Sequence, residues 1–586
     1  MVDIARDPRW GRIVEGAGED PYLGSQIAKY RVLGYQGNNF TLPHSIFTCP
    51  KHFAAYGAVE GGRDYNSVDI SETTLFNVYL PPFISALNNG AGTLMCSFNE
   101  IGSIPSSANK HLLRDILKSK LGFQGLVVSD WNSVGELINH GIALDSQEAA
   151  LLSINAGVDI DMESNSYFNN LKELINTNKI DIKVINDAVK RVLRVKFALG
   201  LFDNPYKYCN KSEEKQNTLT SEMIDFSRES AKKSIVLLKN NDNILPLTKD
   251  IKSIAIIGYL ANSKKNPLGS WEQLGDSNNV VTLLDGIKNK LNNSIKIDYS
   301  VGCFITDSTR KYFSEAIELA KNSDYVILNI GEDSKMTGEA KSKSNINLPG
   351  IQEELAKEIY KVNKNLIVVL SNGRPLTINW LSENVPAILE TWFLGLQSGN
   401  AIADVIFGDY NPSAKLPVTF PRSTGQIPIY YNHKSTGRPS SDNLTQLTSR
   451  YIDLSSSPLY PFGFGLSYST YKYSNLRLDK KSLNESDSLK VSIDIDNLSN
   501  RDGNEVVQLY IQDITASITR PVKELKAFKK VFIPANTKTT INFTLKNEDL
   551  AFYNNQLEFV SETGKFKVFV GTNSEEVLEN SFELIK

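Results

Sequence analysis

Asp130 is the residue in this chain whose position best suits chemistry. It ends the apolar run Gly125-Leu-Val-Val-Ser-Asp130 and is followed by Trp131. A carboxylate at the end of a strand can act as a nucleophile or as an acid or base, although Asp is also a favoured helix cap. The indole of Trp131 offers a flat apolar face to the apolar side of a sugar ring. The pair therefore indicates a sugar site, with a helix cap as the alternative.

Two basic clusters lie near the ends of other apolar runs. Lys51 and His52 can donate hydrogen bonds to substrate hydroxyls or to a carboxylate, and a plain salt bridge with a satisfied histidine is the alternative. The segment Arg6-Asp-Pro-Arg-Trp-Gly-Arg12 brings guanidinium groups close to a strand end. These groups can donate bidentate hydrogen bonds to hydroxyls or carboxylates, or form surface salt bridges.

A charged loop in the middle of the chain is the fourth candidate. The apolar run 325–331 leads into Glu332-Asp-Ser-Lys-Met-Thr-Gly338-Glu339-Ala-Lys. Loops held by a rigid scaffold often carry catalytic residues, whereas many charged loops are simply solvated. The sequence therefore offers Glu332 and Glu339 as further candidate carboxylates.

Other kinds of catalytic centre find little support in the sequence. The chain has five histidines, and none is paired at the spacing of a metal site. No Gly-x-Ser-x-Gly elbow or Walker loop occurs. The four cysteines stand singly, which favours free thiols over a zinc site or a disulfide scaffold. We expect neither a metal nor a cofactor.

Composition excludes several classes of protein. The 586 residues include 63 Lys plus Arg and 66 Asp plus Glu, a formal charge of -3 that does not suit a nucleic-acid binder. Hydrophobic residues make up 41%, which is typical of a globular chain. The longest apolar runs, such as Ser253–Gly258, are far shorter than the ~18–20 residues of a bilayer span. We expect neither nucleic acid nor a membrane as a partner.

The elements that must position these residues form three domains and a linker. Residues 1–205 alternate apolar runs with helical patterns, which predicts a parallel sheet with helical crossovers and favours a (β/α) barrel. The expected strands number five, whereas a barrel needs eight, so the barrel is incomplete. The expected strands are Met1–Ala5, Phe47–Phe53, Thr93–Phe98, Leu126–Asp130 and Val158–Met162, and the expected helices are His111–Leu121 and Val184–Leu199.

The rest of the chain changes its pattern twice. Residues 218–430 alternate strands and helices again, which predicts an α/β sandwich domain. A linker rich in Ser, Thr, Gly, Pro and Tyr is expected over 431–470. From 471 to 586 the apolar period becomes two, as at Leu489, Val491, Ile493 and Ile495, which predicts a β-sandwich of fibronectin type III-like size. The fold class is therefore α/β multidomain with a C-terminal β-sandwich.

With these clusters in view, the chain resembles the β-glucosidases of glycoside hydrolase family three, bacterial periplasmic type. The resemblance covers essentially the whole chain. It rests on an ordered set of motifs: Arg6–Arg12, Lys51-His-Phe-Ala-Ala-Tyr-Gly57, Val128-Ser-Asp-Trp131, Asn372-Gly-Arg-Pro375, Glu390-Thr-Trp392, Phe407-Gly-Asp-Tyr-Asn-Pro412, Lys415-Leu-Pro417 and Tyr460-Pro-Phe-Gly-Phe-Gly-Leu-Ser-Tyr468.

The resemblance implies roles for the candidate residues. Asp130 matches the nucleophile of a retaining mechanism and Glu339 the general acid/base, with Glu332 as the alternative to Glu339. Such a pair stands ~5–5.5 Å apart across the scissile bond, so the two domains that carry them must dock firmly. The residues that match sugar-binding and subsite-lining positions are Arg12, Lys51, His52, Met95 and Phe98, with Trp131 as the expected platform.

The chain also departs from the family pattern. Family members place about three more barrel strands, and a substrate-binding Asp, ahead of the point where this chain starts. A fragment of a longer protein, a second chain that completes the barrel, and a degenerate remnant are the possible explanations, of which we favour a truncated gene model. The resemblance implies a periplasmic or secreted location, and no signal peptide is visible at the N-terminus.

The function expected from these observations is an exo-acting retaining β-glucosidase. It would release terminal nonreducing β-D-glucosyl residues from oligosaccharides or β-glucosides through a covalent glycosyl-enzyme. Three alternatives remain: β-xylosidase or another β-glycosidase specificity, a truncated noncatalytic sugar-binding remnant, and an interaction role of the fibronectin-like domain. A homodimer is a further expectation.

Overall fold

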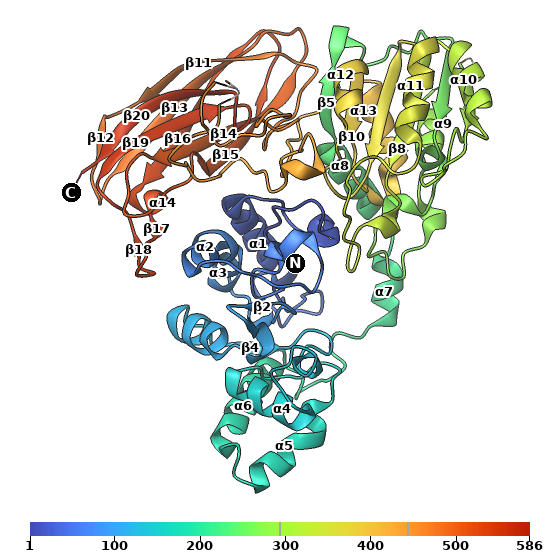
Figure 1. Cartoon of the computed structure of the whole chain (residues 1–586). Helices are drawn as coiled ribbons and strands as arrows, with labels where there is room; N and C mark the ends of the chain where they lie inside the picture. The colour runs from blue at the N-terminus through green and yellow to red at the C-terminus, as the bar shows by residue number, and fades with distance from the viewer. Residues whose placement is uncertain (292–294, 442, 444, 586) are drawn as a thin grey trace. The chain divides into compact units, whose positions relative to one another are not determined.

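The computed structural model describes residues 1–291, 295–441, 443 and 445–585 (Figure 1). It contains two compact units. The first unit comprises Met1–Trp10 and Glu15–Thr218, and the second comprises Gly11–Val14 and Leu219–Lys586. Positions 442 and 444 of the predicted linker, and 292–294 and 586 of the two predicted domains beside it, lie outside the described residues.

The five apolar runs of the first unit lie side by side in chain order, with parallel pairing wherever they pair. β1 (Thr93–Met95) and β4 (Leu126–Val128) form a parallel ladder. Phe53 bridges Cys96, and Val128 bridges Ile160, again in parallel. The neighbouring runs are joined by backbone hydrogen bonds from Val2 N to Lys51 O, Phe53 N to Met95 O, Cys96 N to Val128 O and Ser129 N to Ile160 O, each 2.8–2.9 Å long. This is the order expected of consecutive barrel strands.

Regular strand in this unit is shorter than the sequence predicts. Only β1 and β4 form ladders among the five runs, and each has three residues. Where the ladder stops, side-chain oxygens accept the backbone hydrogen bonds. His52 N donates to Asp3 Oδ2, and Met162 N donates to Ser129 Oγ. The polar residues that interrupt the strands thus satisfy the backbone groups that a longer ladder would have paired.

Helices flank these runs, and several of them begin at side-chain caps. Asp20 accepts a hydrogen bond from Leu23 N at the start of α1, and Asp145 caps α4 in the same way. The two predicted helices are found, one as a π-helix over His111–Lys120 and the other as α6. The helices of the unit are α1 (Pro21–Gln36), α2 (Glu72–Thr74), α3 (Pro81–Asn88), α4 (Ser146–Ala156), α5 (Ser166–Asn176), α6 (Ile182–Ala198) and α7 (Lys211–Asn217).

A six-stranded sheet forms the first half of the second unit. Its strand order is β5-β10-β9-β8-β6-β7, and all pairs are parallel except that of β5 with β10. The carboxyl ends of the parallel strands β8, β9 and β10 therefore lie at the same end of the sheet. The strands are β5 (Val236–Asn240), β6 (Ser253–Ile257), β7 (Lys296–Ser300), β8 (Tyr325–Gly331), β9 (Leu366–Ser371) and β10 (Ala387–Glu390).

Helices cover both faces of this sheet, as Figure 1 shows. Alternate residues of β6 serve the two cores, with Ile254 and Ile256 on one side and Ala255 and Ile257 on the other. Burial on both faces explains why its central strands read as continuous apolar runs. One core includes residues of α8 (Ser221–Ser234), α9 (Leu283–Lys290) and α13 (Ser398–Ile406), and the other includes residues of α10 (Phe313–Lys321), α11 (Gln352–Val362) and α12 (Asn379–Asn384).

A β-sandwich forms the second half of the unit. One sheet has the order β11-β13-β16 and the other β12-β20-β19-β14-β15. The alternating residues Leu489 to Ile495 of β13 are all buried in its core. The strands are β11 (Tyr471–Leu478), β12 (Ser482–Leu483), β13 (Ser488–Asn497), β14 (Gly503–Asp513), β15 (Glu524–Ile533), β16 (Lys538–Lys546), β19 (Gly564–Gly571) and β20 (Val577–Leu584). Smaller elements are β2 (Glu100–Ile101), β3 (Ile104–Pro105), α14 (Asn547–Leu550), β17 (Phe552–Tyr553) and β18 (Phe559–Val560).

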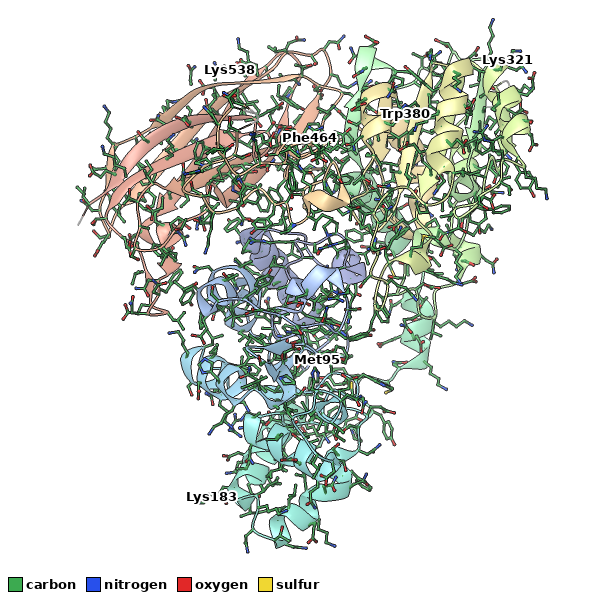
Figure 2. All side chains as sticks on the ribbon, viewed as in Figure 1. Met95, Lys183, Lys321, Trp380, Phe464 and Lys538 are labelled. Atoms are coloured by element: carbon green, nitrogen blue, oxygen red, sulfur yellow. The ribbon has the colours of Figure 1, made fainter. Side chains whose placement is uncertain are left out.

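The segment between the six-stranded sheet and the β-sandwich packs against both. Phe464, labelled in Figure 2, lies against the core of the six-stranded sheet, and its carbonyl accepts a hydrogen bond from Leu416 N. The ring of Tyr431 stacks on Phe462 at 4.5 Å, and its hydroxyl accepts from Leu525 N in β15. None of the helices in the described part of the chain is long and apolar enough to cross a membrane.

Candidate active site

His52 lies between two carboxylates in the first unit. Its ring Nδ1 is 3.0 Å from Asp3 Oδ2, and its Nε2 is 3.4 Å from Asp130 Oδ2. All three side chains are buried. Because Asp3 also accepts the His52 backbone N–H, it fixes both the position and the rotation of the imidazole. We call Asp3, His52 and Asp130 the strand-end cluster.

The carboxylate of Asp130 is held as a hydrogen-bond acceptor. Its Oδ1 accepts the backbone N–H of Trp131 at 2.7 Å, and its Oδ2 faces the His52 ring. Both contacts fix the orientation of the carboxylate, which suits a nucleophile. The indole of Trp131 itself is 61% exposed, so its face is open to a ligand.

The other predicted residues of the first unit lie on the adjoining runs. Phe98 is buried, and its ring is 5.8 Å from that of Tyr56, which in turn lies 5.2 Å from the His52 ring. Met95 ends β1 (Figure 2), and its backbone N–H donates to Pro50, next to half-buried Lys51. The structure thus brings His52 and Asp130 into contact and links Phe98 to them through an aromatic ring.

Glu339 and Arg12 come together in the second unit. Arg12 Nη1 is 3.6 Å from Glu339 Oε1, and the guanidinium lies 6.0 Å from the centre of the Trp271 ring. Arg12 is buried, whereas the Glu339 side chain keeps 30% of its surface exposed. A partly exposed carboxylate on a loop can exchange a proton with a substrate, which suits an acid/base.

Glu332, the alternative acid/base, has a different environment. It lies directly after β8 and is completely buried. Its Oε1 is 3.1 Å from Arg374 Nε and 3.2 Å from Lys343 Nζ. A carboxylate enclosed by two cations serves as their counter-charge and cannot reach a substrate, which favours Glu339. We call residues 332–343 the Glu339 loop.

Comparison with known proteins identifies the family. The model described as "Glycosyl hydrolase family 3 N terminal domain" matches residues 1–195, and that described as "Glycosyl hydrolase family 3 C-terminal domain" matches residues 235–468. A periplasmic beta-glucosidase of Salmonella typhimurium is 42% identical over 100% of this chain and 80% of its own length. The chain belongs to glycosyl hydrolase family 3. The resemblance seen in the sequence motifs is thereby confirmed.

Further relatives of this family 3 chain differ in the sugar that their names specify. A beta-xylosidase of Formosa agariphila is 41% identical over 97% of the chain and 80% of the relative. A crystal structure of beta-glucosidase from Listeria innocua in complex with isofagomine matches with a TM-score of 0.96 and 41% identity, covering 100% of this chain and 81% of that chain.

The family model of a fibronectin type III-like domain matches residues 505–574. The predicted fold class is confirmed.

Residues beyond the predicted set also shape the site. Asp3 lies in the first apolar run. The sequence feature that could have identified it is a carboxylate near the end of a predicted strand. Trp271 lies in a loop without any such signal. Arg374 belongs to the motif Asn372–Pro375, but its partners include backbone carbonyls, which a sequence does not display.

Glu390 is a second buried carboxyl group at the end of the sheet where Glu332 lies, since it ends β10 as Glu332 follows β8. Burial raises its pKa from 4.5 to about 8, although it accepts hydrogen bonds from Trp392 N and Asn372 Nδ2. The nearby charge of Glu332 contributes in the same direction. The raised pKa favours the protonated, neutral form of Glu390 at neutral pH.

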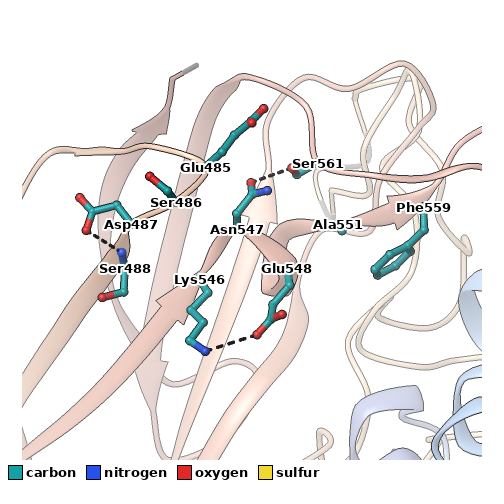
Figure 3. Close-up of a pocket in the computed structure, with 10 residues that line it drawn as sticks. All are labelled: Glu485, Ser486, Asp487, Ser488, Lys546, Asn547, Glu548, Ala551, Phe559 and Ser561. Carbon is teal, nitrogen blue, oxygen red and sulfur yellow. Dashed lines mark hydrogen bonds and ion pairs between the residues drawn. The ribbon is translucent and has the colours of Figure 1, made fainter. Parts of the chain in front are cut away.

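A hollow of about 640 Å³ lies on the β-sandwich (Figure 3). Its polar groups engage one another, since Lys546 Nζ is 3.6 Å from Glu548 Oε1 and Ser561 Oγ donates to Asn547 Oδ1. None of the nine candidate site residues from the sequence, Glu332 included, lines it. Among the residues that the structure describes, no group of three or more His, Cys, Asp or Glu side chains is placed to hold a metal ion.

Proposed function

We propose that this family 3 chain is a retaining exo-β-glucosidase that releases terminal β-D-glucosyl residues from β-glucosides and oligosaccharides. The observation that carries the proposal is Asp130. It is a buried carboxylate at a strand end, oriented by the Trp131 backbone and by His52, in a chain that belongs to a glycoside hydrolase family.

In the first half-reaction, Asp130 attacks the anomeric carbon of the sugar. The bond from that carbon to the glycosidic oxygen breaks, and Glu339 donates its proton to the departing oxygen. The products are an alcohol and a glucosyl ester of Asp130. The fixed orientation of Asp130 lowers the entropy cost of attack, because the carboxylate does not have to be ordered during the reaction.

In the second half-reaction, Glu339 acts as a base. It takes a proton from water while the oxygen of that water attacks the anomeric carbon and displaces Asp130. Glucose leaves with its anomeric configuration retained. Lys51, His52 and Arg12 can donate hydrogen bonds to sugar hydroxyls, and Met95, Phe98 and Trp131 supply apolar and aromatic surface for the ring.

The test is a pair of variants with azide as an external nucleophile. In D130A, hydrolysis of a nitrophenyl β-glucoside should fall by several orders of magnitude, and azide should restore turnover with α-glucosyl azide as product. In E339A, azide attacks the glucosyl-enzyme instead, so the product should be β-glucosyl azide. The control D115A changes an exposed aspartate of the first unit and should keep full activity. Unchanged hydrolysis by D130A would refute the nucleophile.

Sugar specificity has one serious alternative, because a relative of similar identity is named a beta-xylosidase. A panel of nitrophenyl β-glucoside, β-xyloside, β-galactoside and arabinopyranoside separates the two readings by kcat/KM. A higher value for the xyloside would favour β-xylosidase. A periplasmic location and a homodimer complete the proposal, and they are tested by cell fractionation and by the mass of the purified protein in solution.

A further inference from the structure

Arg374 holds both limbs of the Glu339 loop. It lies in the turn after β9 and is completely buried. Its Nη2 donates to Met336 O at 2.5 Å and to Lys341 O at 2.9 Å. These carbonyls belong to the residues three before and two after Glu339, so one rigid planar group ties together the two ends of the segment that presents the carboxylate.

Glu332 fixes the guanidinium in turn. Arg374 Nε is 3.1 Å from its Oε1, and Lys343, at the far end of the loop, reaches the same oxygen at 3.2 Å. The ion pair is buried, so loss of Glu332 would leave the Arg374 charge without this counter-charge in a low-dielectric site. Glu332 therefore anchors the loop at both of its ends.

The backbone of Arg374 is anchored as well. Asn372 Nδ2 donates to the Arg374 carbonyl at 2.9 Å and to Glu390 Oε2 at 3.0 Å. Within the loop, Gly338 N donates to Gly11 O at 2.8 Å. The Glu339 loop is thus bonded both to the turn that follows β9 and to the segment that carries Arg12.

We propose that Arg374, locked by Glu332, is the positioning residue that places Glu339 for proton transfer in both half-reactions. It acts through the backbone carbonyls of the loop. This inference rests on the acid/base role proposed for Glu339. A change at Arg374 should then impair proton transfer selectively, because the strand-end cluster that carries the nucleophile does not include it.

Leaving groups of different acidity separate positioning from general damage. The first half-reaction, measured as kcat/KM, needs the proton of Glu339 when the leaving group is phenol and hardly needs it when the leaving group is 2,4-dinitrophenol. R374K keeps the charge opposite Glu332 but loses the planar fork. We expect kcat/KM for phenyl β-glucoside to fall about 10- to 100-fold and that for 2,4-dinitrophenyl β-glucoside to fall less than about threefold.

Azide provides the second readout. With the dinitrophenyl substrate, R374K should be slowed in the second half-reaction, and azide should raise kcat and give β-glucosyl azide. The matched control R310K changes an exposed arginine of the same α/β domain and should leave both substrates unaffected. Equal losses for the two substrates, or no loss for either, would overturn the positioning role.

Two further variants make the result decisive. R374M/E332Q removes the two fully buried charges together and leaves only Lys343, whose side chain is 23% exposed, without its ion pair to Glu332. Thermal melting shows whether the variant folds. It should show the same selective loss. E339Q separates this proposal from the proposed function: selective loss in E339Q without selective loss at Arg374 refutes the positioning role. If E339Q shows no selectivity, or the unaltered protein hydrolyses no β-glycoside, the proposed function fails instead.

Discussion

Glu390→Gln tests whether a neutral carboxylic acid is buried beside the Arg374 network. In the folded protein, burial raises the pKa of Glu390 to about 8, against an ordinary value of 4.5. Between these values the folded state holds one proton more than the unfolded state. The free energy of unfolding therefore falls as pH rises from about 4.5 to about 8, and the dependence ends once both states are ionised.

The size of the effect follows from the two pKa values. Each pH unit inside the window changes the free energy of unfolding by about 1.4 kcal/mol. Across the window from 4.5 to 8, the loss amounts to roughly 5 kcal/mol. Glutamine keeps the shape of the protonated acid but does not titrate. Its altered hydrogen bond to Asn372 shifts stability by an amount that does not depend on pH.

The assay is denaturant unfolding of both proteins at pH 5, 6, 7, 8 and 9, followed by tryptophan fluorescence. Trp392 lies two residues from Glu390 and bonds to it, so it reports on the same domain. The difference in free energy of unfolding, E390Q minus the unaltered protein, should increase up to pH 8 and then level off. The exposed Glu383 of the same domain provides the control E383Q, whose difference should be flat. A flat difference for E390Q as well would refute a neutral Glu390.

Two further variants test the packing of the loop and of the α/β domain. In G11A the new Cβ would lie 2.3 Å from Gly338 O and 2.7 Å from Lys341 O, so the Glu339 loop must move and kcat should fall about tenfold, measured with nitrophenyl β-glucoside. G34A, where nothing lies within 4 Å of the added methyl, is the control and should retain activity. D404N removes the buried carboxylate that Arg228 and Lys290 share and should cost about 3 kcal/mol of stability in denaturant unfolding, near the lower end of the usual range because Arg228 is 37% exposed. A loss below about 1 kcal/mol would show that solvent screens this ion pair.

The sequence predicts best the elements that are buried on both faces. β8 begins and ends at the residues of the predicted apolar run 325–331, and six of its seven residues are buried. β7, in contrast, reads Lys-Ile-Asp-Tyr-Ser and lies at an edge of the sheet, where only Ser300 is fully buried. An edge strand has no continuous apolar run, so periodicity alone could not identify it.

The candidate site likewise contains residues that the sequence could identify and contacts that it could not. Asp130 could be proposed because it ends a predicted strand and belongs to the motif Val128–Trp131. Glu339 could be proposed because it lies in the charged loop that follows the apolar run 325–331. The contact of Arg12 with Glu339 could not be inferred, since 327 positions separate the two residues in the chain. Nor could the role of Arg374, because the carbonyls of Met336 and Lys341 become acceptors only through the path of the loop.

Tyr431 limits how freely the fibronectin-like domain can be exchanged between family members. Its ring stacks on Phe462 while its hydroxyl accepts from the backbone of β15, and Val522 N donates to His433 O nearby. A chimaera joined at residue 470 would take Tyr431 and His433 from one parent and their hydrogen-bond partners Leu525 and Val522 from the other. A graft of the fibronectin-like domain should therefore include residues 431–470. The stacked rings of Tyr431 and Phe462 and the strand β15 then come from the same parent protein.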